Sequence, residues 1–134
     1  MMQDIILAVI DQLLANATVA ANVGTNIYRG NLPPSPPYPS VVVDRVTKLR
    51  EAGNNTAHYA TARIQCTVFT QSDGLTETIS EAIADCLHST TNTFMNTVYV
   101  IRIEDAGGAP DNSDALTVGI FRDHRDFLIF YSAH

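Results

Sequence analysis

Five consecutive charged or titratable residues, Arg122-Asp123-His124-Arg125-Asp126, form the densest cluster of chemically active side chains in the sequence. A histidine beside carboxylates can exchange protons near neutral pH, which is the chemistry of general acid–base catalysis. Here, however, arginines stand on both sides of His124, so that the charges of the cluster nearly cancel. We therefore interpret the cluster as a solvated charge cluster or an ion-pair network at an interface.

The other three histidines lie apart from this cluster. His88 closes a predicted helix, where a cation interacts favourably with the helix dipole, His58 begins a predicted strand, and His134 is the final residue. The sequence contains no Gly-x-Ser-x-Gly elbow, phosphate-binding loop, Gly-x-Gly-x-x-Gly, Cys-x-x-Cys or His-Glu-x-x-His motif. The sequence therefore offers no convincing catalytic constellation.

Four acidic residues, Glu104, Asp105, Asp111 and Asp114, crowd a region that is predicted to be largely a loop. A calcium site would require oxygen ligands at regular spacing and a closing bidentate glutamate, and these residues do not match that pattern. We interpret them as an exposed acidic loop and predict no metal site.

The two cysteines, Cys66 and Cys86, fall on faces that are predicted to be buried. Two cysteines do not make a disulfide framework, and a protein that is not secreted seldom keeps a disulfide. The N-terminal stretch lacks the positive residues of a signal peptide, and no apolar run approaches the ~18 residues of a membrane span. We expect buried free thiols in a soluble, unsecreted protein without membrane contact.

The overall charge argues against nucleic acid as a tightly bound partner. The 134 residues carry 8 basic and 14 acidic side chains, a formal net charge of −6, and the basic residues are scattered. Nonspecific affinity for nucleic acid comes from clustered Lys and Arg, so tight DNA binding is not expected, although an acidic wall past which DNA slides is compatible with this charge. The length suits one domain, residues 1–134, with a core of its own.

Two segments, residues 2–16 and 71–89, carry hydrophobic residues with helical spacing and are predicted to be helices. The second of these helices should begin at Ser72 or Asp73, whose side chains suit an N-cap. Residues 58–70 instead alternate between apolar and polar side chains, which predicts a strand with one buried face.

The remaining predicted strands show a less regular alternation of apolar and polar residues. A short strand is expected at 27–29, and longer ones at 40–47 and 97–106. Residues 116–133 form either one long, bent strand or two strands that meet at a turn. Between the strands at 40–47 and 58–70, residues 48–57 carry charges, Gly and Asn and are predicted to be the flexible loop of a hairpin.

Five prolines fall between Pro33 and Pro39, directly before the strand at 40–47. Proline fixes φ and has no N–H to donate, so this stretch cannot lie in a central strand and favours an extended, polyproline-like path. It is either a rigid surface connector or a preformed spacer that holds the edge of the following strand at a subunit boundary.

These elements give the order α-β-β-β-α-β-β and predict an α+β fold, with a mostly antiparallel sheet of four to five strands and two helices packed on one face. The opposite face of strand 58–70 carries polar side chains and must meet water, a lumen or a partner. The residues on this face are Tyr59, Thr61, Arg63, Gln65 and Thr67.

The layout of the whole chain resembles a known family. An amphipathic N-terminal helix precedes a proline-rich run into "YPSVVVDRV", an alternating strand carries "ARIQCTVFT", and a helix begins in "SDGLTETISEAIADCL". A further strand, a Gly/Asp loop and the closing "RDHRDFLIFYSA" complete the pattern. This order is similar to that of the small tail terminator, or tail completion, proteins of long-tailed bacteriophages.

The resemblance implies a structural virion protein that is assembled in the host cytoplasm and located at the neck end of the tail. Such proteins form a ring, usually a hexamer, that caps the head-proximal end of the tail tube and stops its polymerisation. Their partners are further copies of the chain, the major tail tube protein and a head-side connector or head-completion protein. Genome DNA passes through the ring without being specifically bound, and catalytic residues and cofactors are absent.

Two groups of residues are candidates for the contacts of such a ring. In a ring closed by head-to-tail contacts, a stiff boundary segment would fix the closing angle, and Arg63 could pair across the boundary. The candidate interface residues are Pro33, Pro34, Pro36, Pro37, Tyr38, Arg63, Gln65 and Thr67. The candidate loop for contact with the tube or the head contains Lys48, Arg50, Glu51, Asn54 and Asn55.

Three other functions remain open from the sequence. The first is a different neck component, a head-completion or connector adaptor protein, which shares the size, acidity and ring assembly. The second is a small ligand-binding or enzymatic α+β domain, which a deep pocket that gathers His124, Asp126 and the acidic loop would favour. The third is an oligomeric adaptor unrelated to phages.

Overall fold

The computed structural model describes residues 5–52, 58–95, 98–111 and 119–132. It confirms the α+β class, but the predicted number of elements is wrong, since the described residues form three helices and six strands. Their order is α1 (Ile5–Ala15), α2 (Ala17–Val23), β1 (Ile27–Arg29), β2 (Ser40–Ala52), β3 (His58–Thr70), α3 (Asp73–His88), β4 (Thr93–Met95), β5 (Val98–Asp111) and β6 (Phe121–Ser132).

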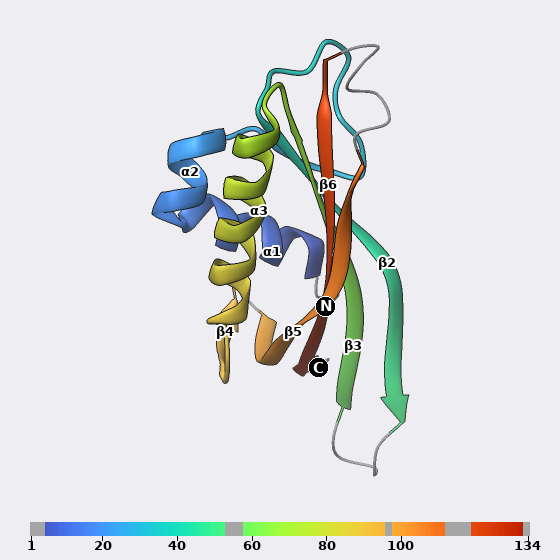
Figure 1. The fold of residues 1–134 in the computed structure, drawn as a ribbon. Helices are drawn as coiled ribbons and strands as arrows, with labels where there is room; N and C mark the ends of the chain where they lie inside the picture. Colours follow the sequence, from blue (N-terminus) through green and yellow to red (C-terminus); the bar gives the residue numbers. More distant parts are fainter. Residues whose placement is uncertain (1–4, 53–57, 96–97, 112–118, 133–134) are drawn as a thin grey trace.

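The six strands form one sheet in the order β1-β2-β3-β6-β5-β4. All neighbouring strands are antiparallel except β1 and β2, which run parallel. The three helices lie together on one side of the sheet, as Figure 1 shows. The prediction that the helices cover the same sheet face is therefore confirmed.

The N-terminal helix is followed directly by a second, unpredicted helix. The side chain of Asn16 accepts a hydrogen bond of 3.0 Å from the Val19 amide and so caps the start of α2. The amide of Asn16 itself donates to the carbonyl of Leu13, which ends α1. One asparagine thus separates two helices that are bent by 88° relative to each other, and Gly24 then ends α2 at a positive φ of 59°.

The hairpin formed by β2 and β3 is longer than predicted. Its register runs from Ser40 opposite Phe69 to Ala52 opposite His58, with an irregularity between Arg45 and Thr47. Residues 48–52 therefore belong to β2, because each of them pairs with a residue of β3. The prediction of a loop at 48–52 is wrong. The rest of the predicted loop, residues 53–57, lies outside the described residues.

The second half of the sheet also differs from the prediction. Strand β5 continues to Asp111, so residues 107–111 are a strand rather than a loop, and residues 121–132 form the single strand β6 through the charged cluster. The pairing of β5 with β6 shifts between Asp105 and Gly107. At Gly108 a Cβ atom would lie 1.9 Å from the backbone oxygen of His124, so this close approach of the two strands requires glycine.

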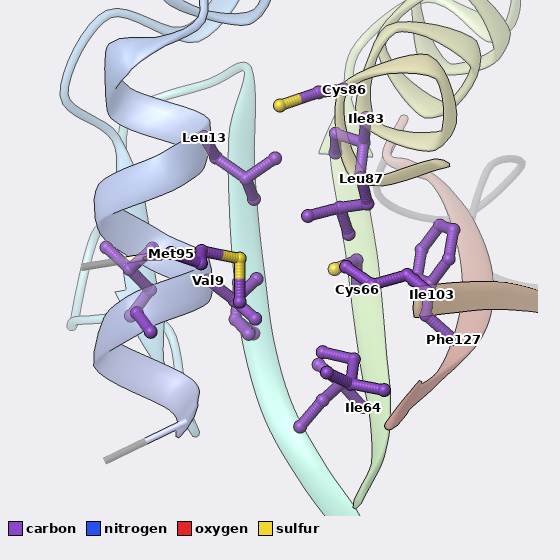
Figure 2. Packing of buried hydrophobic residues seen from close by; sticks show 14 of the residues in the cluster. Val9, Leu13, Ile64, Cys66, Ile83, Cys86, Leu87, Met95, Ile103 and Phe127 are labelled. Carbon is purple, nitrogen blue, oxygen red and sulfur yellow. The ribbon is translucent and has the colours of Figure 1, made fainter. Parts of the chain in front are cut away.

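The hydrophobic core lies between the helices and the covered face of the sheet. Figure 2 shows Val9 and Leu13 of α1 on one side of the core and Ile83 and Leu87 of α3 on the other. The strands contribute alternate residues to this core, as period-two patterning predicts. Its sheet members include Val41, Val43, Ala60, Ala62, Ile64, Cys66, Val68, Val100, Ile103, Phe127, Ile129 and Tyr131.

Candidate functional site: the open face of the sheet

The face of the sheet opposite the helices is the candidate functional surface, and we call it the open face. Because paired residues on neighbouring strands point to the same side, the register of β3 with β6 defines its centre. No described helix lies over it (Figure 1). Its central residues are Thr61, Arg63, Gln65, Thr67 and Phe69 of β3, and Arg122, His124, Asp126, Leu128 and Phe130 of β6.

A polar network joins the two central strands on the open face. The guanidinium of Arg63 lies 2.7 Å from the Asp126 carboxylate through Nη2, and its Nε donates a hydrogen bond of 2.8 Å to the same oxygen. The other carboxylate oxygen accepts a hydrogen bond of 3.1 Å from the side-chain amide of Gln65. Asp126 is only 9% exposed, so these two donors replace much of the water that a free carboxylate would bind.

This network gives Arg63 a partner within its own chain, the carboxylate of Asp126. The sequence showed that Arg63 and Asp126 each lie in a strand, but only the β3–β6 register reveals that they share a face. Asp126 was therefore missed as the partner, because no sequence pattern specifies which strands lie next to each other.

The charged cluster at 122–126 is divided between the two faces of the sheet. On the open face, the Nδ1 atom of His124 lies 3.4 Å from the hydroxyl oxygen of Thr67. On the covered face, Arg125 lies 3.4 Å from Glu81 of α3 and 3.6 Å from Asp105 of β5. Successive side chains of β6 point to opposite faces of the sheet, so the charged residues of the cluster form ion pairs within the chain on both faces.

A cation–π contact extends the open face towards β5. The guanidinium carbon of Arg102 lies 4.0 Å from the ring centroid of Phe130, and its Nε lies 3.5 Å from a carboxylate oxygen of Glu104. Leu128 and Phe130 are half-buried beside it. The open face therefore combines paired charges with apolar side chains, which suits a wet contact or a water-filled passage rather than a second core.

The acidic residues expected in one loop do not converge. Glu104 and Asp105 are neighbours on β5 and pair with different arginines, Asp111 is the last residue of that strand, and Asp114 lies outside the described residues. Within the described ranges, no group of three or more His, Cys, Asp or Glu residues is placed to hold a metal ion. His88 is exposed at the end of α3, and His134 lies outside the described part.

A shallow, open groove of about 450 Å³ lies between α2 and α3, on the helical side of the molecule. Its lining contains Glu77, Glu81 and Asp85, and includes neither His124 nor Asp126. It therefore does not form the pocket around His124 that would favour a ligand-binding or enzymatic domain.

Both cysteines are buried free thiols, as predicted. Burial, with a smaller contribution from the negative charge of Asp126, raises the pKa of Cys66 from 9.0 to about 12. Burial also raises the pKa of Cys86, whose thiol lies 3.8 Å from the carbonyl oxygen of Gln12. Such thiols stay protonated and react slowly, so they act as small apolar core residues.

The proline stretch does not follow the extended path that was predicted. Ser35 has a positive φ of 52°, which turns the chain, and the Tyr38–Pro39 peptide bond is cis. The C-terminal end of the stretch is held in place by side chains, because the Asn26 amide donates to the Pro39 carbonyl at 3.3 Å and the Ser40 hydroxyl donates to the Pro37 carbonyl. The candidate interface residues Pro34 and Pro37 are exposed.

The candidate loop residues are distributed differently from the prediction. Lys48, Arg50 and Glu51 are positions of β2, whereas Asn54 and Asn55 lie outside the described residues. Among the described helices, none is long and apolar enough by itself to cross a membrane; α1 and α2 pass that test of length and composition only as a bent pair.

Comparisons with known proteins agree with this fold. A family model described as "Tail completion protein gp17" matches residues 7–122. A chain of a solved structure titled "Virion of native gene transfer agent (GTA) particle" is similar with a TM-score of 0.72 and 20% sequence identity, over 95% of this chain and 93% of that chain. At this identity the likeness concerns the fold alone, and no curated protein matches the sequence.

Proposed function

Since this chain belongs to the tail completion protein gp17 family, and is therefore a structural protein of the phage virion tail and not an enzyme, we propose that it closes into a ring at the end of the tail tube. The ring is a hexamer of single-domain subunits, residues 1–134. It caps the head-proximal end of the tube, stops further polymerisation and presents the surface to which the head-side connector or head-completion protein joins.

One observation carries this proposal: all three described helices cover the same face of the sheet and leave the opposite face open. A sheet that is covered on one side only needs a second environment for its other side. In the ring, the helices lie outside and the open face lines the central passage. Side chains such as Gln65, Thr67 and His124 then meet water in the passage.

The charges of the open face suit the passage of DNA. The positive charge of Arg63 is held 2.7 Å from Asp126, and the whole chain has a formal net charge of −6. Tight binding to phosphates requires basic side chains that are free to release counterions, so a wall of this kind lets DNA slide. Duplex DNA should bind the assembled ring no better than micromolar at physiological salt, and nanomolar affinity would contradict a passage lined by this face.

The remaining candidate residues are assigned to contacts around the ring. The proline stretch, with Pro33, Pro34, Pro36, Pro37 and Tyr38, lies against a neighbouring subunit, and its fixed φ angles lower the entropy that is lost on closing the ring. The far end of the β2–β3 hairpin, with Lys48, Arg50, Glu51, Asn54 and Asn55, reaches the tube or the head.

Tail length in a phage that lacks this gene tests the capping role. Loss of a protein that stops tube polymerisation gives overlong tubes, which electron microscopy measures directly. Normal tails that fail to join heads would contradict capping and instead indicate a head-completion or connector adaptor protein. Complementation with the wild-type gene is the control.

Light scattering on the purified chain tests the ring. We expect a mass of six subunits of 14.6 kDa in the presence of the tail tube protein, which offers the surface on which the ring closes. A chain that stays monomeric with and without the tube protein would contradict the ring.

A further inference from the structure

We propose that the subunits of the ring join edge to edge, with the outer edge of β2 of one copy paired to the outer edge of β5 of the next. This inference rests on the proposed ring and specifies its contact. It arises from the ends of the sheet: the outermost strands β1 and β4 are only three residues long and leave most of β2 and β5 uncovered.

The uncovered edges have similar lengths. Strand β1 pairs only with Val41, Val42 and Val43, and strand β4 only with Val98, Tyr99 and Val100. Among the described residues, no strand pairs with the outer edge of β2 over 44–52 or of β5 over 102–111. Backbone N–H and C=O groups along such edges are a template for pairing with another strand.

The directions of the two strands are compatible. Three antiparallel steps separate β2 from β5 across β3 and β6, so the two strands run in opposite directions within one sheet. Rotation about a ring axis does not change the direction of a strand relative to that axis. The β2 edge of one copy therefore meets the β5 edge of the next in antiparallel orientation, and one type of contact closes the ring head to tail.

The two uncovered stretches meet only if neighbouring copies are staggered. Across one sheet, Asp44 is level with Gly107, because Asp44 pairs with Gln65, Gln65 with Asp126 and Asp126 with Gly107. Without stagger, β1 and β4 would stand between the copies. A shift that brings Asp44 opposite Asp111 moves both short strands clear of the contact, and it equals 111 − 107, or four residues.

This stagger matches the geometry of a closed barrel. A stagger of four residues is a shift of roughly 13 Å along the strand direction. The four strands β2, β3, β6 and β5 span roughly 19 Å across the sheet. The ratio of these two lengths gives a strand tilt of about 35° to the ring axis, within the range of closed barrels. The shape of one sheet therefore supplies the tilt that closure requires.

Charge and irregularity make the contact selective. The β2 edge, 44–52, has three basic and two acidic residues, and the β5 edge, 102–111, has one basic and three acidic residues, so the edges have net charges of +1 and −2. Pairing of two β2 edges or two β5 edges would bring like charges together. Register shifts at Arg45/Thr47 and Asp105/Gly107 also interrupt the regularity of these strands, as in natural sheets that avoid nonspecific edge pairing.

Two variants with reversed edges test the assignment. In the first, Arg45→Glu changes the β2 edge from +1 to −1; in the second, Glu104→Lys with Asp111→Lys changes the β5 edge from −2 to +2. Each variant alone should lose the ring and elute at the 14.6 kDa mass of one subunit, because its own edges then repel each other. An equimolar mixture should recover rings in which the two variants alternate.

The control reverses two exposed carboxylates of α3, Glu77→Lys with Asp85→Lys, which should leave the ring intact. Circular dichroism melting checks that each edge variant is folded. Folded edge variants that both keep the wild-type ring, or a mixture that stays monomeric, would overturn the edge assignment. A wild-type chain that forms no ring with the tube protein would contradict the proposed function itself, so the two failures are distinguishable.

Discussion

Arg63 of β3 and Asp126 of β6 form an ion pair of 2.7 Å on the open face, although 63 positions separate them in the sequence. The carboxylate of Asp126 is largely withdrawn from water, whereas 44% of the Arg63 side chain is exposed. The pair therefore stabilises the contact between the two central strands of the sheet from inside one subunit.

Reversal of the charge at position 63 should consequently weaken the fold. Arg63→Glu places a second carboxylate beside Asp126, and we expect the free energy of unfolding to fall by about 1–3 kcal/mol, a range reduced for the exposure of residue 63. Chemical denaturation measures this change. In an Asp126→Asn background the same reversal should cost less than half as much, and an equal loss in both backgrounds would show that the pair is not the cause.

Gly108→Ala should disrupt the pairing of β5 with β6. The added Cβ would lie 1.9 Å from the His124 oxygen and 2.8 Å from the Arg125 Cα, both backbone atoms that cannot turn away. We expect a loss of about 3 kcal/mol or more, since relief requires the strands to separate. Gly74→Ala is the matched control, because nothing lies within 4 Å of its Cβ position and alanine favours a helix. Equal melting temperatures for the two variants would contradict the prediction.

Ile83→Ala should destabilise the core shared by α3 and β3. The side chain is 1% exposed and lies among the residues that Figure 2 shows between α1, α3 and β3. Removal of its outer carbons should lower the free energy of unfolding by about 2–5 kcal/mol, measured by urea denaturation. Leu7→Ala, at a position that is 46% exposed, should change it by less than about 1 kcal/mol. A loss at position 83 as small as at position 7 would contradict the assigned packing.

Stability should fall at alkaline pH because of Cys66. Its pKa is 9.0 when unfolded and about 12 when folded, so above pH 9 the unfolded chain releases a proton that the folded chain keeps. This contribution is fully present below pH 9 and is lost as pH rises. The free energy of unfolding should be about 1 kcal/mol lower at pH 10 than at pH 8 from this thiol alone.

A Cys66→Ala variant provides the comparison for this effect. It should be less stable at pH 8 because of the lost packing, but its stability should decline less steeply between pH 8 and pH 10. A residual slope is expected from Cys86, whose pKa is also raised by burial. Identical slopes for the wild type and the variant would exclude Cys66 as the origin.

The elements that could be predicted from the sequence are those with a long, regular pattern. The alternation of 58–70 predicted β3 with its observed bounds, and helical spacing located α1 and α3 to within a few residues. The three-residue strand β4 was missed, because so short a segment has no detectable period and owes its conformation to pairing with Val98, Tyr99 and Val100. Helix α2 was missed because its start depends on one capping asparagine.

The candidate surface was only partly predictable for a related reason. Alternation placed Arg63, Gln65 and Thr67 on one face of β3 without any knowledge of the neighbouring strand. Their partners Asp126 and His124 follow from the register with β6, which is set by tertiary packing rather than by local sequence. The proline stretch departed from its predicted extended path because Ser35 adopts a left-handed conformation that composition does not indicate.

The central place of β6 in the sheet has a consequence for how the chain reaches its fold. Strand β6 inserts between β3 and β5, and its pairs with β3 join residues 51 to 73 positions apart, from Thr70 with Phe121 to Tyr59 with Ser132. Contacts between such distant residues raise the contact order and slow folding, because the entropy of closing long loops is lost before the contacts form. During synthesis, β3 cannot pair with β6 until β6 has left the ribosome, which happens after every other described element has been made. A nascent chain therefore cannot complete its sheet, and with it the pairing surfaces for other copies, until β6 has left the ribosome.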